Sequence, residues 1–196
     1  MDQFPKEPKK IVERIQRYES ALRKELKSFG SIDDGAGRRY LLGALYLKLG
    51  DVKGALQSYQ WLAQVVPDDM GEPLDYLCWS LALYRAGDLE AAAKKLLQTM
   101  LRNLYLLPAL LEIEQNRLDI WHGTNWAEKS YVQYAPAEVL ALWDATALEW
   151  AKQMYQSPNF REVRDRYITI YKQLQAEPVG PKRSQLVQEA FQLETS

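Results

Sequence analysis

The chain has 196 residues, of which 47% are hydrophobic and 26% are charged. This length and apolar content suit one compact domain that needs neither a disulfide nor a metal for its stability. The 25 Lys and Arg residues against 26 Asp and Glu residues give a formal net charge of −1. Proteins that grip nucleic-acid phosphates normally carry a basic surplus, so we expect no nucleic-acid partner.

Single copies of two residue types limit the chemistry further. Cys78 is the only cysteine, so the chain forms no internal disulfide, and His122 is the only histidine. One histidine cannot by itself build a zinc site, and we expect neither a metal nor a cofactor. The first ten residues carry charges and two prolines where a signal peptide needs an apolar run. Because no stretch of about 18 uncharged apolar residues follows, we expect no membrane span and a cytoplasmic location.

Residues 1–35 are predicted to form an N-terminal amphipathic helix and a loop. One apolar stripe recurs at intervals of three and four, on Ile11, Ile15, Tyr18, Leu22, Leu26 and Phe29. Gly30 is expected to end this helix, and residues 31–37 to form the loop.

Two Gly-Asp pairs, at residues 50–51 and 87–88, divide the next part of the chain into helical runs. Glycine supplies the left-handed backbone that ends a helix in a tight corner. Aspartate can then cap the first free N–H groups of the following helix. The pattern predicts two antiparallel helical hairpins side by side, with helices over 40–49, 52–66, 76–86 and 89–101.

At these hairpins the chain resembles the tetratricopeptide repeat. The first unit, counted from Ala36, matches the family at Gly43, Tyr46, Ala55, Tyr59 and Pro67. The second unit, counted from Pro73, keeps Tyr76, Trp79, Gly87-Asp88 and Ala92 but has no closing proline. The stretch 34–143 is also similar to repeat segments of bacterial proteins of undefined role. The resemblance implies an all-α, right-handed superhelix of antiparallel helical hairpins, with extra N- and C-terminal helices.

The remaining chain is expected to cover the hairpins, because about three stacked units are needed for stability. The pattern predicts helices over 104–118, 126–134 and 136–155, with a turn at 119–125. A narrow apolar seam then predicts a helix over 160–174, followed by a linker over 177–184. A last short helix carries Leu186, Val187, Ala190 and Phe191 on one face. We assign 36–156 to the tetratricopeptide-like domain and 157–196 to C-terminal helices that pack on or extend it.

The candidate binding residues come from the first helix of each hairpin, which lines the concave face in this family. These residues are Tyr40, Ala44, Leu47 and Lys48 in the first unit and Leu77, Leu81, Tyr84 and Arg85 in the second. Family members that clamp a terminal carboxylate place Lys, Asn and Arg here, so such a clamp is not expected. An apolar groove with Lys48 and Arg85 on its rim suits an amphipathic helix. The alternative is that the chain's own later helices fill the groove.

Other residues have ordinary structural interpretations. Trp143 and Trp150, seven residues apart, are expected in the core, whereas Trp121 and Trp126 suit a surface role. Cys78 is expected to be a packed thiol. The acidic pairs 33–34 and 68–69 precede helices and are interpreted as caps.

We therefore predict a non-catalytic adaptor or scaffold, with another protein or a peptide as partner and self-association into a homodimer as a further option. The alternative is an enzyme whose active site is built from scattered Asp, Glu, Arg and Tyr residues. A deep cavity with convergent carboxylates would favour catalysis, and an open apolar groove would favour binding.

Overall fold

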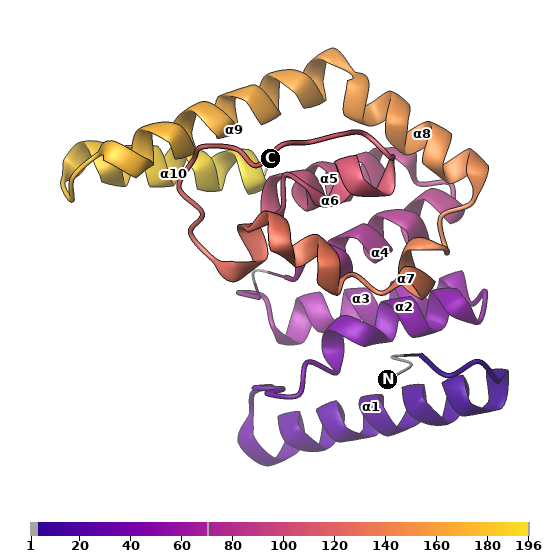
Figure 1. Ribbon diagram of the computed structural model, residues 1–196. Helices are drawn as coiled ribbons and strands as arrows, with labels where there is room; N and C mark the ends of the chain where they lie inside the picture. Colours follow the sequence, from indigo (N-terminus) through magenta and orange to yellow (C-terminus); the bar gives the residue numbers. More distant parts are fainter. Residues whose placement is uncertain (1–3, 70, 196) are drawn as a thin grey trace.

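The computed structural model describes residues 4–69 and 71–195, and within these ranges the chain is all α-helical without any strand. Figure 1 shows the helices in successive layers, with α1 (Pro8–Phe29) at one end and α8 (Ala145–Gln156) and α9 (Pro158–Ala176) at the other. One continuous apolar core includes residues from Phe4 to Ala190.

The first predicted hairpin consists of α2 (Arg39–Lys48) and α3 (Val52–Val65). Gly50 has a φ of 76° at the corner between them. The carboxylate of Asp51 then accepts a hydrogen bond from the Gly54 N–H at 2.8 Å. The corner is therefore built from a left-handed glycine and an aspartate cap, as predicted.

The second hairpin, α4 (Pro73–Arg85) and α5 (Leu89–Arg102), repeats this geometry. Gly87 has a φ of 84°, and Asp88 accepts from the Ala91 N–H at 3.1 Å. Helix α4 packs against both α2 and α3, so the two hairpins are neighbours. Both Gly-Asp corners are thus confirmed.

A close approach inside the first hairpin explains why residue 43 is glycine. A Cβ atom placed on Gly43 would lie 1.9 Å from the Tyr59 hydroxyl oxygen and 2.2 Å from its ring carbon Cζ. Tyr59 is only 1% exposed and stacks on Trp79 of α4 with ring centroids 4.8 Å apart. This one tyrosine therefore contacts both hairpins, and it leaves no room for a side chain at position 43.

The N-terminal helix α1 forms where the apolar stripe predicts it, but Phe29 at the end of that stripe is 79% exposed. Its buried residues Ile11, Ile15 and Leu22 lie on one face, and the helix packs against α2. Gly30 ends it with a φ of 72°, where the Gly30 N–H bonds to the Leu26 carbonyl.

The predicted helix over 104–118 is wrong: only α6 (Leu106–Leu110) forms. Glu112 has a φ of 55°, and the Ile113 N–H turns back to the Pro108 carbonyl at 2.8 Å. Beyond this point the Leu118 N–H donates to the Tyr105 hydroxyl at 3.0 Å, which is a tertiary rather than a helical partner.

The region 126–155 is also more broken than predicted. It contains two 3₁₀ segments, η1 (Asn125–Ala127) and η2 (Lys129–Tyr134), and two α-helices, α7 (Ala137–Leu140) and α8. The single helix predicted over 136–155 stops at residue 140 and restarts at Ala145, where Asp144 caps the N–H groups of Thr146 and Ala147.

Helices α9 and α10 (Pro181–Thr195) form a hairpin whose two arms both contact α5. The seam predicted over 160–174 is confirmed, since the buried residues of α9 are Phe160, Tyr167, Ile170 and Leu174. Helix α10 begins inside the predicted linker. No helix in the described ranges has both the length and the apolar character to cross a membrane.

Candidate functional site

The four apolar residues of the predicted groove lie inside the protein. Ala44, Leu47, Leu77 and Leu81 are at most 3% exposed. These four described residues therefore do not line an open groove. The reason is that the chain covers this side itself: the Tyr131 hydroxyl accepts from the Leu74 N–H at 3.2 Å.

The other four predicted residues are half-buried and have partners within the chain. Tyr84 packs on the Trp150 ring with centroids 4.8 Å apart, and Tyr40 meets the Trp126 ring edge-on. Lys48 lies over the Phe4 ring. Arg85 donates to the Leu142 carbonyl and lies 3.7 Å from the Asp144 carboxylate.

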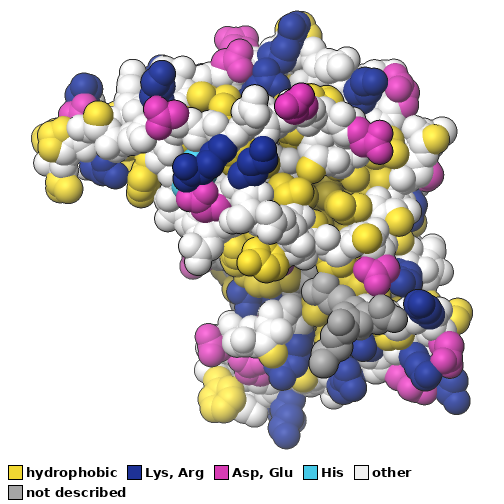
Figure 2. Space-filling model, in the orientation of Figure 1, with side chains coloured by type: hydrophobic (Ala, Val, Ile, Leu, Met, Phe, Trp, Pro, Cys, Tyr) yellow, Lys and Arg dark blue, Asp and Glu magenta, His cyan; other side chains and the backbone are white. Residues whose placement is uncertain are grey.

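The covering segment does not remove all apolar surface from this side. Figure 2 shows hydrophobic side chains at the surface over α4 and α7. The predicted residue Tyr84, its ring partner Trp150 and the Arg85 partner Leu142 are only partly exposed on this side.

The two tryptophans expected in the core differ, since Trp143 is buried and Trp150 is only partly buried. Trp143 is 4% exposed, whereas Trp121 and Trp126 are 38% and 37% exposed. Cys78 is buried, and burial raises the pKa of its thiol well above the usual range. The Nε2 atom of His122 lies 2.9 Å from the Tyr105 hydroxyl.

Helix α10 presents a second apolar surface, and only two of the four residues predicted to share one face of this helix lie on it. Leu186 and Ala190 are buried, whereas Val187 and Phe191 are 47% and 51% exposed, so the four residues do not share one face. Val179, 96% exposed, adjoins them. Figure 2 shows hydrophobic side chains at the free tip of the α9–α10 hairpin.

These exposed residues line a groove of about 500 Å³, which we call the α10 groove; its lining is Val179, Gly180, Arg183, Ser184, Val187, Gln188 and Phe191. Among the described residues that line it, Arg183 alone is ionisable. The Arg183 guanidinium bonds to the carbonyls of Leu174 and Glu177 and lies over the Trp121 ring. The floor of the groove is therefore apolar, and its one cation is already engaged.

A smaller polar cavity lies between the two hairpins, and we call it the α2–α5 cavity. Its volume is about 170 Å³. Its polar and aromatic lining residues come from α2, α3, the connection between α3 and α4, α4 and α5; they are Arg39, Tyr40, Tyr59, Asp69, Asp75, Tyr76, Trp79 and Lys95. Its apolar wall consists of Leu62, Ala63, Val66 and Pro67.

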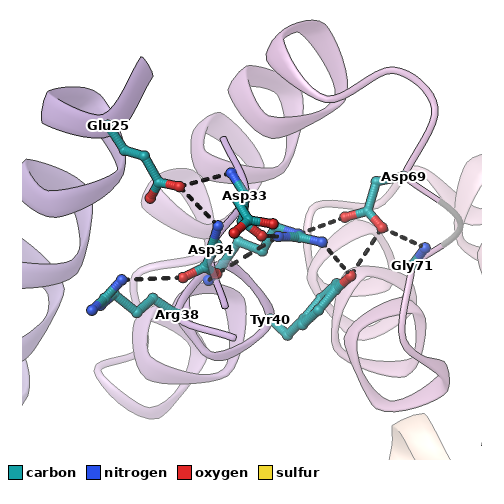
Figure 3. A network of polar contacts seen from close by, with 8 residues as sticks. Glu25, Asp33, Asp34, Arg38, Tyr40, Asp69 and Gly71 are labelled. Atoms are coloured by element: carbon teal, nitrogen blue, oxygen red, sulfur yellow. Dashed lines mark hydrogen bonds and ion pairs between the residues drawn. The ribbon is translucent and has the colours of Figure 1, made fainter. Parts of the chain in front are cut away.

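One edge of this cavity is a closed network of ion pairs and hydrogen bonds (Figure 3). The Arg39 Nε atom donates to Asp69 at 2.7 Å, and the Tyr40 hydroxyl donates to the same carboxylate at 2.9 Å. Asp69 also accepts from the Gly71 N–H at 3.1 Å. Burial alone would raise the pKa of Asp69, but these hydrogen bonds outweigh it and hold the pKa below its usual value.

The network continues to α1 through the loop before α2. Glu25 accepts from the N–H groups of Asp33 and Asp34 at 2.7 Å and 3.0 Å. Asp34 in turn accepts from the Arg39 N–H at 2.7 Å. The predicted capping role is therefore confirmed for Asp34. It is wrong for Asp69, which bonds to Arg39, Tyr40 and Gly71 rather than to the N–H groups of α4.

The opposite side of the cavity holds an ammonium group and a carboxyl group that do not form an ion pair. The Lys95 Nζ atom lies 3.9 Å from the centre of the Trp79 ring and 4.6 Å from that of Tyr76. Burial lowers the pKa of Lys95 to about 8. The Asp75 Oδ1 atom is buried and has no hydrogen-bond partner among the residues that the structure describes. Burial raises the pKa of this carboxyl well above its usual range.

The described part of the chain contains no group of three or more His, Cys, Asp or Glu side chains arranged to hold a metal ion. Comparison with known proteins finds no family model, no curated protein and no solved structure that matches this chain.

Proposed function

We propose that this protein is a non-catalytic, tetratricopeptide-like interaction scaffold that binds an amphipathic helix or peptide of another protein in the α10 groove. The repeat interpretation is supported by the two corners, whose aspartates have nearly the same backbone angles: φ −86° and ψ 76° at Asp51, and φ −86° and ψ 77° at Asp88. Interaction proteins of this family use helical hairpins as a rigid frame for a binding surface.

The observation that carries the proposal is the shared exposure of Val179, Val187 and Phe191 along one groove. Apolar residues exposed singly are ordinary, but a contiguous group marks an interaction surface. Covering the exposed half of Phe191 or Val187 contributes about 1 kcal/mol each. The mostly uncharged lining fits the apolar face of a helix, with charged residues of that helix outside the groove.

The proposal is tested by placing charge in the groove. The double variant Val187→Glu/Phe191→Glu is expected to stay folded, because both side chains point to solvent, and to lose partner capture from a lysate of the native cell. Leu89→Glu is the matched control, since Leu89 is also 51% exposed but does not line the α10 groove. Partner capture that survives the double variant contradicts the proposal.

Sedimentation velocity on the same three proteins identifies the partner class. A wild-type dimer that becomes monomeric only in the double variant means that the groove binds a second copy of the chain. A monomer at all concentrations means that it serves a different protein.

A second candidate function, catalysis, is favoured by one observation. The α2–α5 cavity brings together Asp69, Asp75, Arg39, Tyr40 and Lys95, which includes the residue types expected for a dispersed active site. Asp69, Arg39 and Tyr40 bond to one another, so Asp75 and Lys95 are the two groups left to act on a substrate. Catalysis is excluded if the α2–α5 cavity binds no small molecule.

A further inference from the structure

The α2–α5 cavity has the size and access of a small-molecule site. Its volume of about 170 Å³ compares with an apolar cavity of about 150 Å³ that holds one benzene molecule. Tyr76, Trp79 and Lys95 on its lining are all partly exposed, so a solute can reach it from solvent.

The charged groups that face the cavity leave an excess of positive charge. Arg39 and Asp69 neutralise each other across 2.7 Å. The Lys95 Nζ atom donates to the Gln98 side chain at 2.9 Å and rests on the Trp79 ring. No carboxylate of the described residues lies within ion-pair distance of it. Asp75, its nearest acidic neighbour in the cavity, is kept toward the neutral acid by burial. The cavity therefore carries the positive charge of Lys95 and a carboxyl group with one unpartnered buried oxygen.

These features favour an anion over a cation. A carboxylate placed beside Lys95 gains a charge-assisted hydrogen bond, and the protonated Asp75 side chain can donate a second one. A cation would instead meet the ammonium of Lys95, which already occupies the faces of Trp79 and Tyr76. Leu62, Ala63, Val66 and Pro67 offer an apolar wall for a hydrocarbon group.

The geometry points to a binding site for a small aliphatic carboxylate of about five carbons, with its carboxylate on Lys95 and its hydrocarbon against the wall formed by α3 and Pro67. The site is separate from the α10 groove, so it stands or falls independently of the proposed scaffold function.

The test uses three probes with one branched carbon skeleton and different head groups: isovalerate, isoamyl alcohol and isoamylamine. Binding is measured by two-dimensional NMR with isotope-labelled lysine side chains. Isovalerate is expected to bind with a Kd on the order of 1 mM, as suits so few non-hydrogen atoms. The alcohol and the amine are expected to bind at least about tenfold more weakly, because neither carries the negative charge that pairs with the Lys95 ammonium.

Two lysine variants separate this site from general attraction to a basic surface. Lys95→Met keeps a chain of similar length against Trp79 and removes the charge; it is expected to weaken isovalerate binding at least about tenfold. Lys94→Met is the matched control, because Lys94 is its exposed neighbour on α5, and it is expected to leave the Kd within about twofold.

The wild-type protein provides a measurement that does not depend on how a variant folds. The titratable and charged groups around Lys95 are Asp75 and Tyr76 on α4 and Lys94 and Arg102 on α5. Across the cavity lie Arg39, Tyr40, Tyr59 and Asp69. Bound isovalerate is expected to raise the pKa of Lys95 from about 8, since an adjacent anion favours the ammonium form. By linkage, isovalerate affinity then falls between pH 7 and 9.5, by up to about 30-fold if only the ammonium form binds.

The inference is overturned by any of three results. These are equal or tighter binding of the amine, unchanged isovalerate binding in Lys95→Met, and a Lys95 pKa that does not move when isovalerate is added. Absence of binding by all three probes also refutes it, but leaves the α10 groove untouched.

Discussion

The contact between Gly43 and Tyr59 gives the sharpest prediction about how the two hairpins fit together. In Gly43→Ala the new Cβ atom lies 1.9 Å from the Tyr59 hydroxyl oxygen, whereas non-bonded carbon contacts are about 3.5–4.0 Å. The ring is held by its stack on Trp79 and by a hydrogen bond from its hydroxyl to the Asp75 carbonyl at 3.2 Å. Tyr59 must therefore shift by more than an ordinary rotamer adjustment.

The magnitude follows from two opposing effects. Overpacking a well-filled core costs about 1–3 kcal/mol, and replacing a helical glycine by alanine returns up to about 1 kcal/mol. We expect Gly43→Ala to lose about 1–2 kcal/mol of unfolding free energy, measured by urea denaturation. For a chain of this size the loss lowers Tm by roughly 2–8 °C.

Two further variants make this reasoning refutable. Gly35→Ala is the control, because a Cβ at Gly35 meets nothing within 4 Å, and we expect a change within about 0.5 kcal/mol. In Gly43→Ala/Tyr59→Leu the shorter side chain makes room, so the double variant should be about 1 kcal/mol more stable than the sum of the two single losses. A Gly43→Ala protein as stable as wild type, or strictly additive losses, would refute the close-packing argument.

Three other substitutions test separate parts of the structure. Leu47→Glu is expected to cost more than about 3 kcal/mol and to lower helicity by circular dichroism, because an unpaired charge is buried; a folded variant would mean that Leu47 faces an open groove after all. Asp69→Asn is expected to lose about 1–2 kcal/mol at pH 7. Since the folded pKa of Asp69 is lowered, its stabilisation is complete above the unfolded pKa and fades as pH falls through the folded one, so urea curves of the two proteins should converge below about pH 4; a constant difference would contradict this. Arg85→Ala removes the bond to the Leu142 carbonyl and should speed amide hydrogen exchange around residues 140–144 without changing that of α1; unchanged exchange there would show that Arg85 does not anchor the segment.

The parts of the fold that local sequence determines were predictable. A Gly-Asp pair ends one helix and caps the next within five residues, so both corners could be located without tertiary information. The stripe of α1 and the seam of α9 are also local, because each requires only that one face be buried.

The sequence left open that the chain's own later segments fill the groove, but local patterns could not identify which contacts cover it. The contacts that cover it join Leu74 to Tyr131 and Arg85 to Leu142, each pair 57 residues apart. The prediction of one helix over 104–118 is wrong for the same reason, because the Leu118 N–H bonds to the Tyr105 hydroxyl and not to a helical carbonyl. The break before α8 did carry a signal, because Asp144 followed by Thr146 is a helix N-cap pattern.

The α2–α5 cavity was missed because its charged residues come from four separate segments. Asp69 was interpreted as a cap, and its partner Arg39 lies 30 residues earlier. One hint was available: Asp75 precedes Cys78 by three positions and Trp79 by four, which places it on the packed face of α4. A carboxyl group on such a face is a candidate site residue.

The central functional claim is that partners reach this protein at the α10 groove and not at the groove that the chain fills itself. The most direct measurement is photo-crosslinking with a photoreactive phenylalanine analogue placed at position 191, compared with the same analogue at the equally exposed position 89. If partners bind in the α10 groove, covalent adducts with a partner protein or a second copy form from position 191 alone. Adducts from both positions alike, or from position 89 only, would contradict it.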